Sequence, residues 1–456
     1  MKRFALVLSI VIVGCTSDAP PCDDCLVLYD VTVIDGLGNG PAEHQVIIIR
    51  KGVIADIVDV RVYGEPPENQ RIDAAGLYVM PGLIDMHAHV TILPMDKAGA
   101  LISQMDPEAS GQVLRTLLDF GITTIRNPAA PASNGVELRD AVASGIIEGP
   151  EILAAADALN RASADFGPFV ATPTVDAVRA EVGRQALLGV DYIKVYGSLS
   201  PDLIQAAVEE AHVHGLEVIG HLQRTTWTQA AQLGIDHITH GAPWSAEYLP
   251  EAARSGYRGT IKERMTWLEQ VDFSGPAIRE MIQVMADSGV TVDPTLTTYR
   301  VKFHGNDPYY LNNPDSIYAP QLIRDIWRRG TFTDDWTPED YTRGHTVWPR
   351  VLELTKAMYD GGVLLTAGSD LPNPWVVPGA SLHEELKLLY DAGIPAVEVL
   401  RIATHNGAVA LGLEDRIGSI QDGMEADLIV LRANPIADLA NTRAIEWVIL
   451  NGEIRY

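Results

Sequence analysis

Cysteine is almost missing from this chain. Among its 456 residues only Cys15, Cys22 and Cys25 are cysteines, and all three stand in the first 25 positions. The body of the chain therefore has neither a disulfide framework nor a cysteine-rich metal site. Cys22 and Cys25 are spaced to form a disulfide in an oxidising compartment. The same spacing occurs in redox motifs, but no thioredoxin-like strand–helix pattern surrounds these two residues.

Basic residues are also few. The chain has 34 lysines and arginines against 60 aspartates and glutamates, which gives a formal net charge of −26. A surface of that sign repels phosphate backbones, so nucleic acid is not an expected partner. Hydrophobic residues make up 47% of the chain and charged residues 21%, the proportions of a folded globular protein. The length allows about three ordinary domains, or one large barrel with a smaller module.

The N-terminal apolar run, residues 4–13, is too short to cross a bilayer whose hydrocarbon core is ~30 Å thick. Because this run follows a basic start, residues 1–14 are predicted to be a secretory signal peptide. Residues 12–15, Ile-Val-Gly-Cys, resemble a bacterial lipobox, in which Cys15 is lipidated. The alternative is an ordinary signal peptide with an incidental cysteine. We expect residues 15–25 to be a lipidated tether, and the protein to be exported to the periplasm and held at the outer membrane through that lipid alone.

Both ends of the remaining chain carry signals for short strands. Residues 26–80 contain Val- and Ile-rich runs broken by Gly, Asn and Pro, and residues 415–456 have the same texture. We expect these two segments to form one small composite β-sandwich. Residues 81–414 instead alternate apolar runs with amphipathic stretches, a pattern that is typical of successive βα units.

Eight apolar runs in the middle segment are candidate strands. They cover residues 82–90, 122–127, 151–155, 192–197, 217–223, 237–241, 290–296 and 364–370. A βα series of this length predicts a closed, TIM-like (β/α)8 barrel, so the expected fold class is α/β. The seventh and eighth runs are separated by an insertion at about residues 297–350 that is rich in Tyr and Trp. This insertion is either a lid or pocket wall at the C-terminal face of the barrel, or a packed structural addition.

A His-Ala-His motif, His87 to His89, closes the first of these runs. Residues two apart in a strand point to the same face. Both imidazoles would therefore project from the C-terminal end of the strand, where barrel enzymes hold their reacting groups. Paired imidazoles suit zinc, iron, nickel or manganese, although a lone His-x-His motif is weak support for a metal site.

Other residues with metal-binding chemistry lie on the later runs. Lys194 lies inside an apolar run, where a lysine is costly unless it is paired or modified. His221, His240 and Asp370 each stand at the end of a further run. Because the C-terminal ends of parallel strands meet at one end of a barrel, we expect these side chains to gather with the His-Ala-His pair. Tyr196, two residues after Lys194, is expected to face the same side and to contact substrate.

In this order and setting, the chain resembles the amidohydrolase superfamily, and within it the imidazolonepropionase-like and prolidase-like branch. The matching stretches are VMPGLIDMHAHV (79–90), GITTIRN (121–127), DYIKVYG (191–197), GIDHITHG (234–241), TAGSD (366–370) and ATHNGAVALGLEDRIGSIQDGMEADLIVL (403–431). The resemblance covers essentially all of the expected mature chain. It implies a metal-dependent (β/α)8 barrel with a small β-sandwich built from both termini, in agreement with the pattern of apolar runs.

The resemblance also implies a metal ligand set. His87 and His89 would bind one divalent metal ion, and His221 and His240 a second. Lys194, carboxylated by CO2, would bridge the two ions, because a carbamate offers two anionic oxygens to cations ~3.5–4 Å apart. The expected cofactors are therefore two divalent ions, for which zinc is the first choice.

Asp370 is implied to bind the first metal ion and to be the catalytic residue that takes a proton from water and returns it to the leaving amine. Asn127 and Gln223 stand where many relatives have an acid and a histidine, but neither departure removes a ligand. His237 lies three residues before His240, so on a strand it would face away from that residue. We expect a supporting or structural role for it.

The leading functional hypothesis is the hydrolysis of C–N amide bonds in small substrates by metal-activated hydroxide. Dipeptides including Xaa-Pro, N-acyl amino acids and cyclic amides all fit. Because a fold and a metal set do not choose the bond, the alternative is a lactonase or phosphoester hydrolase with the same two-metal site. A third hypothesis is a tethered binding protein without catalysis. The expected partner is a small molecule, and a homo-oligomer is left open.

Overall fold

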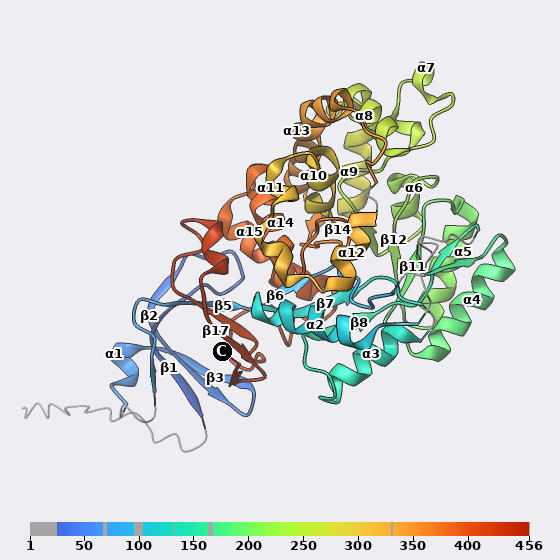
Figure 1. The fold of residues 1–456 in the computed structure, drawn as a ribbon. Helices are drawn as coiled ribbons and strands as arrows, with labels where there is room; N and C mark the ends of the chain where they lie inside the picture. Colours follow the sequence, from blue (N-terminus) through green and yellow to red (C-terminus); the bar gives the residue numbers. More distant parts are fainter. Residues whose placement is uncertain are drawn as a thin grey trace, which may run out of the picture.

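The computed structural model describes residues 25–66, 71–94, 104–131, 133–162, 167–329 and 332–455 (Figure 1). The predicted signal peptide lies outside the described residues, as does the predicted tether up to residue 24, with Cys15 and Cys22. No helix in the described ranges is long and apolar enough to cross a membrane.

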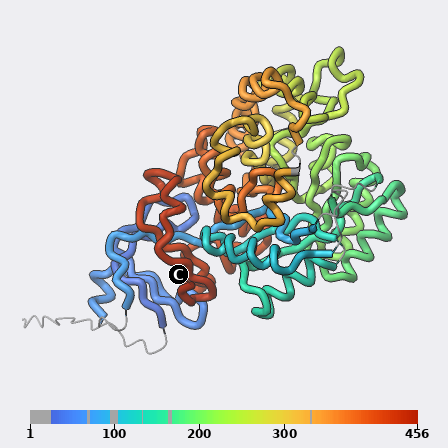
Figure 2. Tube along the Cα trace, viewed as in Figure 1, coloured from blue at the N-terminus to red at the C-terminus, as the bar shows by residue number. Residues whose placement is uncertain are grey.

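Strands from both ends of the chain pair in one sheet. Its members are β1 (Leu26–Val33), β2 (Ala42–Arg50), β3 (Val53–Asp59), β4 (Ile72–Asp73), β5 (Tyr78–Pro81), β16 (Leu428–Leu431), β17 (Ile445–Leu450) and β18 (Glu453–Ile454). The order is β18-β17-β16-β5-β1-β2-β3, and β4 pairs with β1. N-terminal and C-terminal strands meet where β5 pairs with β16 in antiparallel register, Val79 opposite Val430. Figure 2 shows these first and last segments of the chain beside each other.

Each of the eight apolar runs in the middle segment contains a parallel strand. These strands are β6 (Leu83–Asp85), β7 (Ile122–Asn127), β8 (Glu151–Ala154), β11 (Tyr192–Val195), β12 (Glu217–Gly220), β13 (His237–Thr239), β14 (Thr291–Asp293) and β15 (Leu364–Leu365). The first three form one sheet; the others form a second with β9 (Ala158–Asn160) and β10 (Phe169–Ala171). The predicted α/β class with parallel sheets is confirmed.

Two isolated parallel bridges connect these sheets to each other. Ala155, directly after β8, pairs with Tyr192 of β11. Ala88, shortly after β6, pairs with Leu371, which follows β15. The two parallel sheets therefore adjoin at both of these places, and the segments that follow β6 and β15 lie next to each other.

Helices alternate with the parallel strands. They are α2 (Pro107–Asp119), α3 (Asn134–Ala143), α4 (Val175–Leu188), α5 (Pro201–Val213), α6 (Trp227–Gln232), α9 (Pro276–Asp287), α14 (Ala380–Asp391), α15 (Ala396–Ile402) and α16 (His405–Ala410). Helix α5 shows why they cover the sheets. Ser200 stands at its N-cap and Pro201 in its first turn, while Ile204, Ala207 and Ala211 form a buried stripe at helical spacing. This face packs against β11 and β12 (Figure 1).

The segment predicted as an insertion is helical. It contains α10 (Leu296–His304), α11 (Pro308–Leu311), the short 3-10 helix η3 (Pro314–Tyr318), α12 (Gln321–Arg329) and α13 (Pro338–Asp360). Helix α10 packs against both α13 and α14, and α13 packs against α8 (Ile261–Gln270). Tyr299, Phe303, Tyr310 and Trp327 are buried. These aromatic residues belong to the same hydrophobic cluster as buried residues of the parallel strands, such as Ile193 and Val292, so the insertion extends the main core.

Candidate active site

The six residues singled out as metal ligands stand in parallel strands or in the segments that follow them, and Asp370 lies five residues beyond the end of β15. Lys194 lies in β11, His221 follows β12, and His240 follows β13. The first of these strands, β6, ends at Asp85, earlier than the sequence pattern suggests, so His87 and His89 lie in the segment that follows it. Backbone hydrogen bonds still hold this segment against the chain after β15: the amide of Asp370 donates to the carbonyl of His87, and the amide of His89 donates to that of Leu371.

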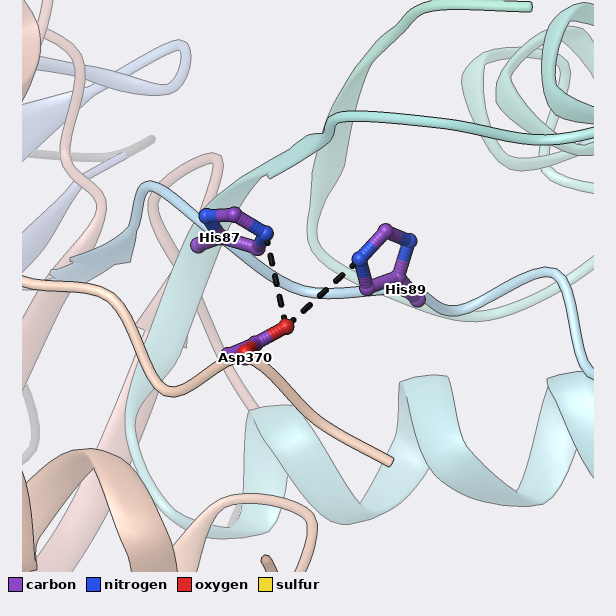
Figure 3. A group of neighbouring side chains, drawn as sticks. All are labelled: His87, His89 and Asp370. Atoms are coloured by element: carbon purple, nitrogen blue, oxygen red, sulfur yellow. Dashed lines mark ion pairs between the residues drawn. The ribbon is translucent and has the colours of Figure 1, made fainter. Parts of the chain in front are cut away.

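His87, His89 and Asp370 converge on one point (Figure 3). The Oδ1 atom of Asp370 lies 3.4 Å from Nε2 of His87 and 3.6 Å from Nε2 of His89. One ligand atom from each residue lies within 4.8 Å of the others. Ligands of one tetrahedral zinc ion, each ~2.1 Å from the metal, are about 3.4 Å apart. The three side chains therefore have the spacing of ligands around a single ion.

His221 and His240 form a second imidazole pair. Nε2 of His240 lies 2.7 Å from Nδ1 of His221, and Nδ1 of His240 lies 2.8 Å from the hydroxyl of Thr295. Burial lowers the pKa of both imidazoles well below the usual value for histidine, so both are neutral at physiological pH. A neutral imidazole keeps one lone pair for a metal, so each histidine of this pair can supply one ligand atom.

Lys194 acts electrostatically on the histidines of both groups. Its Nζ atom is 3.4 Å from the Thr239 hydroxyl, and its side chain is buried. Burial is the main cause that lowers the pKa of His87, His89 and His221, and the positive charge of Lys194 is the second. Burial in turn lowers the pKa of Lys194 to about 7. A substantial fraction of this side chain is therefore an uncharged amine at neutral pH.

A buried pair that the sequence reasoning missed supports His87. Oδ2 of Asp293 lies 2.6 Å from Nδ1 of His87, and Oδ1 of Asp293 accepts a hydrogen bond of 2.8 Å from Arg126 Nη2. Asp293 and Arg126 are both completely buried. With the carboxylate accepting from Nδ1–H, the lone pair of His87 is on Nε2, toward Asp370. Both residues interrupt apolar runs, the signal that identified Lys194, so it could have identified them too.

A second missed carboxylate, Asp85, holds the loops of the site together. Its side chain accepts hydrogen bonds from the amide of His87 and from the amide and hydroxyl of Ser369, at 2.6–3.1 Å. Asp85 thus connects the segment of His87 to the segment of Asp370. Burial raises the pKa of Asp85 to about 6, while these hydrogen bonds act in the opposite direction.

Aromatic rings border the histidine pair. Tyr196 stacks on His221 with ring centroids 4.2 Å apart, so it lies at the site as expected, while its contact with substrate stays a prediction. Tyr299 of α10 was not foreseen. Its ring lies 5.9 Å from that of His240, and its hydroxyl accepts a hydrogen bond from Trp244.

Other histidines lie away from the cluster. His237 contacts Thr291 at 2.7 Å through Nδ1 and Glu217 at 2.9 Å through Nε2, in agreement with the expected supporting role. His304 and His345 stack on each other within the insertion, with ring centroids 4.0 Å apart. Its contacts with Thr291 and Glu217 place His237 in the packing between neighbouring strands, outside the cluster.

The donor set fits divalent metal ions. Neutral imidazoles and a carboxylate are groups that zinc and similar ions bind. Burial also removes the water that would otherwise satisfy these nitrogen and oxygen atoms. Between them, the three-residue cluster and the histidine pair offer donors for two ions.

A profile described as "Amidohydrolase family" matches residues 78–455. The chain belongs to the amidohydrolase family. That profile starts in β5 and includes the parallel strands, the insertion and all six candidate ligands. Members of this family are hydrolases and are typically metal-dependent, in agreement with the convergence of His87, His89 and Asp370.

Curated relatives of this amidohydrolase are distant. Ochratoxinase of Aspergillus niger is 22% identical over 467 aligned positions, which cover 91% of this chain and 82% of that protein. Adenine deaminase of Serratia proteamaculans is 24% identical and matches 89% of this chain, but the aligned part is 53% of the deaminase.

Solved structures share the fold of this amidohydrolase. A Xaa-Pro dipeptidase with methionine bound in its active site superimposes with a TM-score of 0.68, at 22% identity, over 94% of this chain and 99% of that one. Ochratoxinase of A. niger gives 0.67 at 18% identity, over 94% and 95%. A bottromycin amidohydrolase gives 0.68 at 21% identity, over 94% and 86%. At these identities the likeness establishes the fold.

Proposed function

We propose that this protein is a metal-dependent hydrolase that cleaves C–N amide bonds of small substrates: dipeptides including Xaa-Pro, N-acyl amino acids or cyclic amides. The observation that carries the proposal is the convergence of His87, His89 and Asp370 beside the pair of His221 and His240. Membership of the amidohydrolase family supports the amide bond as the bond that is cleaved.

The residues divide into two ligand groups. His87, His89 and Asp370 would hold one ion, His221 and His240 the other, and carboxylated Lys194 would bridge them. When bound, two divalent ions, for which zinc is the first choice, lower the pKa of water from ~15.7 toward ~7 and polarise the scissile carbonyl. The lowered pKa of Lys194 favours carboxylation, because only the uncharged amine adds CO2.

Asp370 is the residue placed to move the proton. Burial raises its pKa to about 6, and Lys302 and Lys194 act in the opposite direction. A carboxylate whose pKa lies just below the working pH can take a proton from attacking water and return it to the leaving amine. Asp293 keeps His87 in the tautomer that leaves Nε2 free, as described above, so the ligand group is oriented before substrate arrives.

The same proposal covers the architecture. The bridges Ala155–Tyr192 and Ala88–Leu371 support a closed (β/α)8 barrel, with the sheet of both termini as its β-sandwich module.

The apolar run of residues 4–13 followed by Cys15 supports export, lipidation and a periplasmic location at the outer membrane. In that location the expected partner is a small molecule that has entered the periplasm.

Two measurements on the purified protein test the function. Metal analysis should find close to two equivalents of divalent metal; a value near zero would instead favour a binding protein. Turnover should then be measured on a panel of dipeptides, N-acyl amino acids, lactones and phosphotriesters, with Asp370→Asn as the matched inactive control. Cleavage confined to lactones or phosphotriesters would contradict the assignment of the amide bond.

A further inference from the structure

A cavity of about 160 Å³ lies beside Asp370 and takes no part in the mechanism above. It is lined by α10, by the chain after Asp370 and by the insertion: Thr298, Val301, Lys302, Gly305, Leu311, Phe332, Thr333, Tyr341, Asn373, Pro374 and Trp375. Two of these residues contact Asp370. Hydrogen bonds from Thr298 and Asn373 act to lower its pKa against the effect of burial, and the Asn373 amide donates to its carbonyl at 2.8 Å.

Helix α10 joins this cavity to the histidine pair. Thr295 at its N-cap contacts His240 at 2.8 Å, and Tyr299, four residues later, borders the same imidazole. Thr298 and Lys302 are also four residues apart, so they lie on one face of the helix. One side of α10 therefore runs from a candidate metal ligand into the cavity.

Among the described residues, no carboxylate lies within ion-pair distance of Lys302; the acid that acts on its pKa is Asp370, itself a candidate metal ligand. Its Nζ atom lies over two aromatic faces, 5.2 Å from the ring centre of Tyr299 and 4.8 Å from that of Phe332. Burial lowers the pKa of Lys302 to about 8, so the ammonium is still mostly charged at neutral pH. Aromatic faces stabilise a cation but accept none of its N–H bonds in the way a carboxylate does.

A second cation stands on the same side of the site. Arg264 of α8 donates through Nε to the carbonyl of Gly259, and its guanidinium lies 5.2 Å from the ring centre of Trp244. Burial and the charge of Lys194 have the largest effects on the pKa of His221, and the charge of Arg264 lowers it further. The charge of Arg264 also acts to lower the pKa of Lys302. Lys302 is the cation that lines the cavity, and Arg264 adds positive charge that acts on it, while Asp370 acts on it in the opposite direction. A cation on the cavity wall, in a chain with a net charge of −26, favours a ligand that brings negative charge.

We propose that Lys302 is a specificity-determining residue: it binds a carboxylate on the substrate, and the cavity holds the apolar or aromatic group next to that carboxylate. This inference rests on the proposed amide hydrolysis and narrows its substrates to acids, such as N-acyl amino acids and dipeptides with a free C-terminus. Phe332 and Trp375 line the cavity, and a cavity of ~150 Å³ in another protein accommodates benzene. One aromatic or branched side chain therefore fits here.

Turnover of a matched pair of substrates tests the proposal. N-acetylphenylalanine and its C-terminal carboxamide share the scissile acetyl bond and differ in the carboxylate alone. The intact protein should favour the acid. Lys302→Gln should lower the ratio of kcat/KM for the acid to kcat/KM for the carboxamide by about 10- to 100-fold, the size of one charge-assisted hydrogen bond. The ratio is the readout because Lys302 also acts on the pKa of Asp370, which affects both substrates alike. Lys302→Arg should restore most of the preference. Lys387→Gln, on an exposed lysine of α14, is the matched control.

A binding measurement keeps this test separate from the proposed reaction. 3-Phenylpropanoate and 3-phenylpropan-1-ol contain no amide bond, so calorimetric binding of this pair reports on the cavity even if no amide is cleaved. The acid should bind at least about 10-fold more tightly than the alcohol, and Lys302→Gln should abolish that difference with unchanged metal content. If the variant keeps the preference for the acid, or lowers turnover of both N-acetyl substrates equally, Lys302 does not bind the carboxylate and the proposal is wrong.

Discussion

The pair of Asp293 and Arg126 offers a sharp test of how the site is held. Asp293→Asn removes the negative charge between Arg126 and His87, at 2.8 and 2.6 Å, and leaves the Arg126 guanidinium completely buried without its counter-charge. Removing one partner of a buried ion pair costs about 3–5 kcal/mol of unfolding free energy. Because the same carboxylate orients His87, metal affinity should also fall by about 10- to 100-fold.

A double-mutant cycle in the metal-free protein measures the pair. Asp293→Asn, Arg126→Met and the double variant would be unfolded in urea with a chelator present, followed by tryptophan fluorescence. Each single change should cost about 3–5 kcal/mol. The double change should cost at least about 2 kcal/mol less than the sum of the two, since it leaves no uncompensated charge.

The matched control is the pair of Arg139 and Asp191, which has the same 2.8 Å separation but lies partly exposed to solvent. Asp191→Asn should cost no more than about 1 kcal/mol, because solvent screens such pairs. If the Asp293 and Arg126 variants were additive within about 0.5 kcal/mol, or if Asp293→Asn bound metal as tightly as the unaltered protein, the proposed support of His87 would be refuted.

Three further outcomes are expected. Asp370→Asn should lose nearly all turnover while its circular dichroism and thermal midpoint stay close to those of the unaltered protein, and retained activity would exclude the proton role. Lys194→Ala should purify with less metal; two full equivalents in that variant would rule out the bridge. Reconstitution of the metal-free protein with zinc, at constant dissolved CO2, should increase as pH rises, with a half-point near 7, because burial lowers the pKa of Lys194 to about 7 and the uncharged form lies above it. A half-point above pH 9, near the ordinary value for lysine, would contradict this.

Much of the fold could be read from the sequence because its parallel strands are short apolar runs of conventional kind. Tyr192 to Val195, for example, is buried at every position and is apolar apart from Lys194, so the run stands out from the amphipathic helices on either side. The end of the strand before His87 was harder to predict. Leu83 to Asp85 is only three residues long, and hydrogen bonds to residues far along the chain hold the segment that follows it. The sequence shows the apolar run, but not the residue at which its pairing with the neighbouring strand ends.

Within the site, the sequence identified residues whose chemistry is conspicuous and missed those whose importance depends on partners. Lys194 is conspicuous because a lysine inside an apolar run needs an explanation. Arg126 and Asp293 needed the same explanation. They pair with each other across 167 positions of the chain, and no local sequence pattern shows such a pair. The position of Lys302 depends on the direction of α10. Glu385 fixes that direction by accepting hydrogen bonds from backbone amides in the first turn of the helix.

The course of α10 has a practical meaning for anyone who wishes to redesign substrate choice in this enzyme. A chimaera that exchanges α10 with its N-cap, together with the rest of the insertion, would also exchange Thr295 and Tyr299, which lie next to His240. Such a graft would alter catalysis and selectivity together. Exchanging only the chain beyond Gly305, where α10 ends, would leave the contacts with His240 in place and confine the change to the outer wall of the cavity.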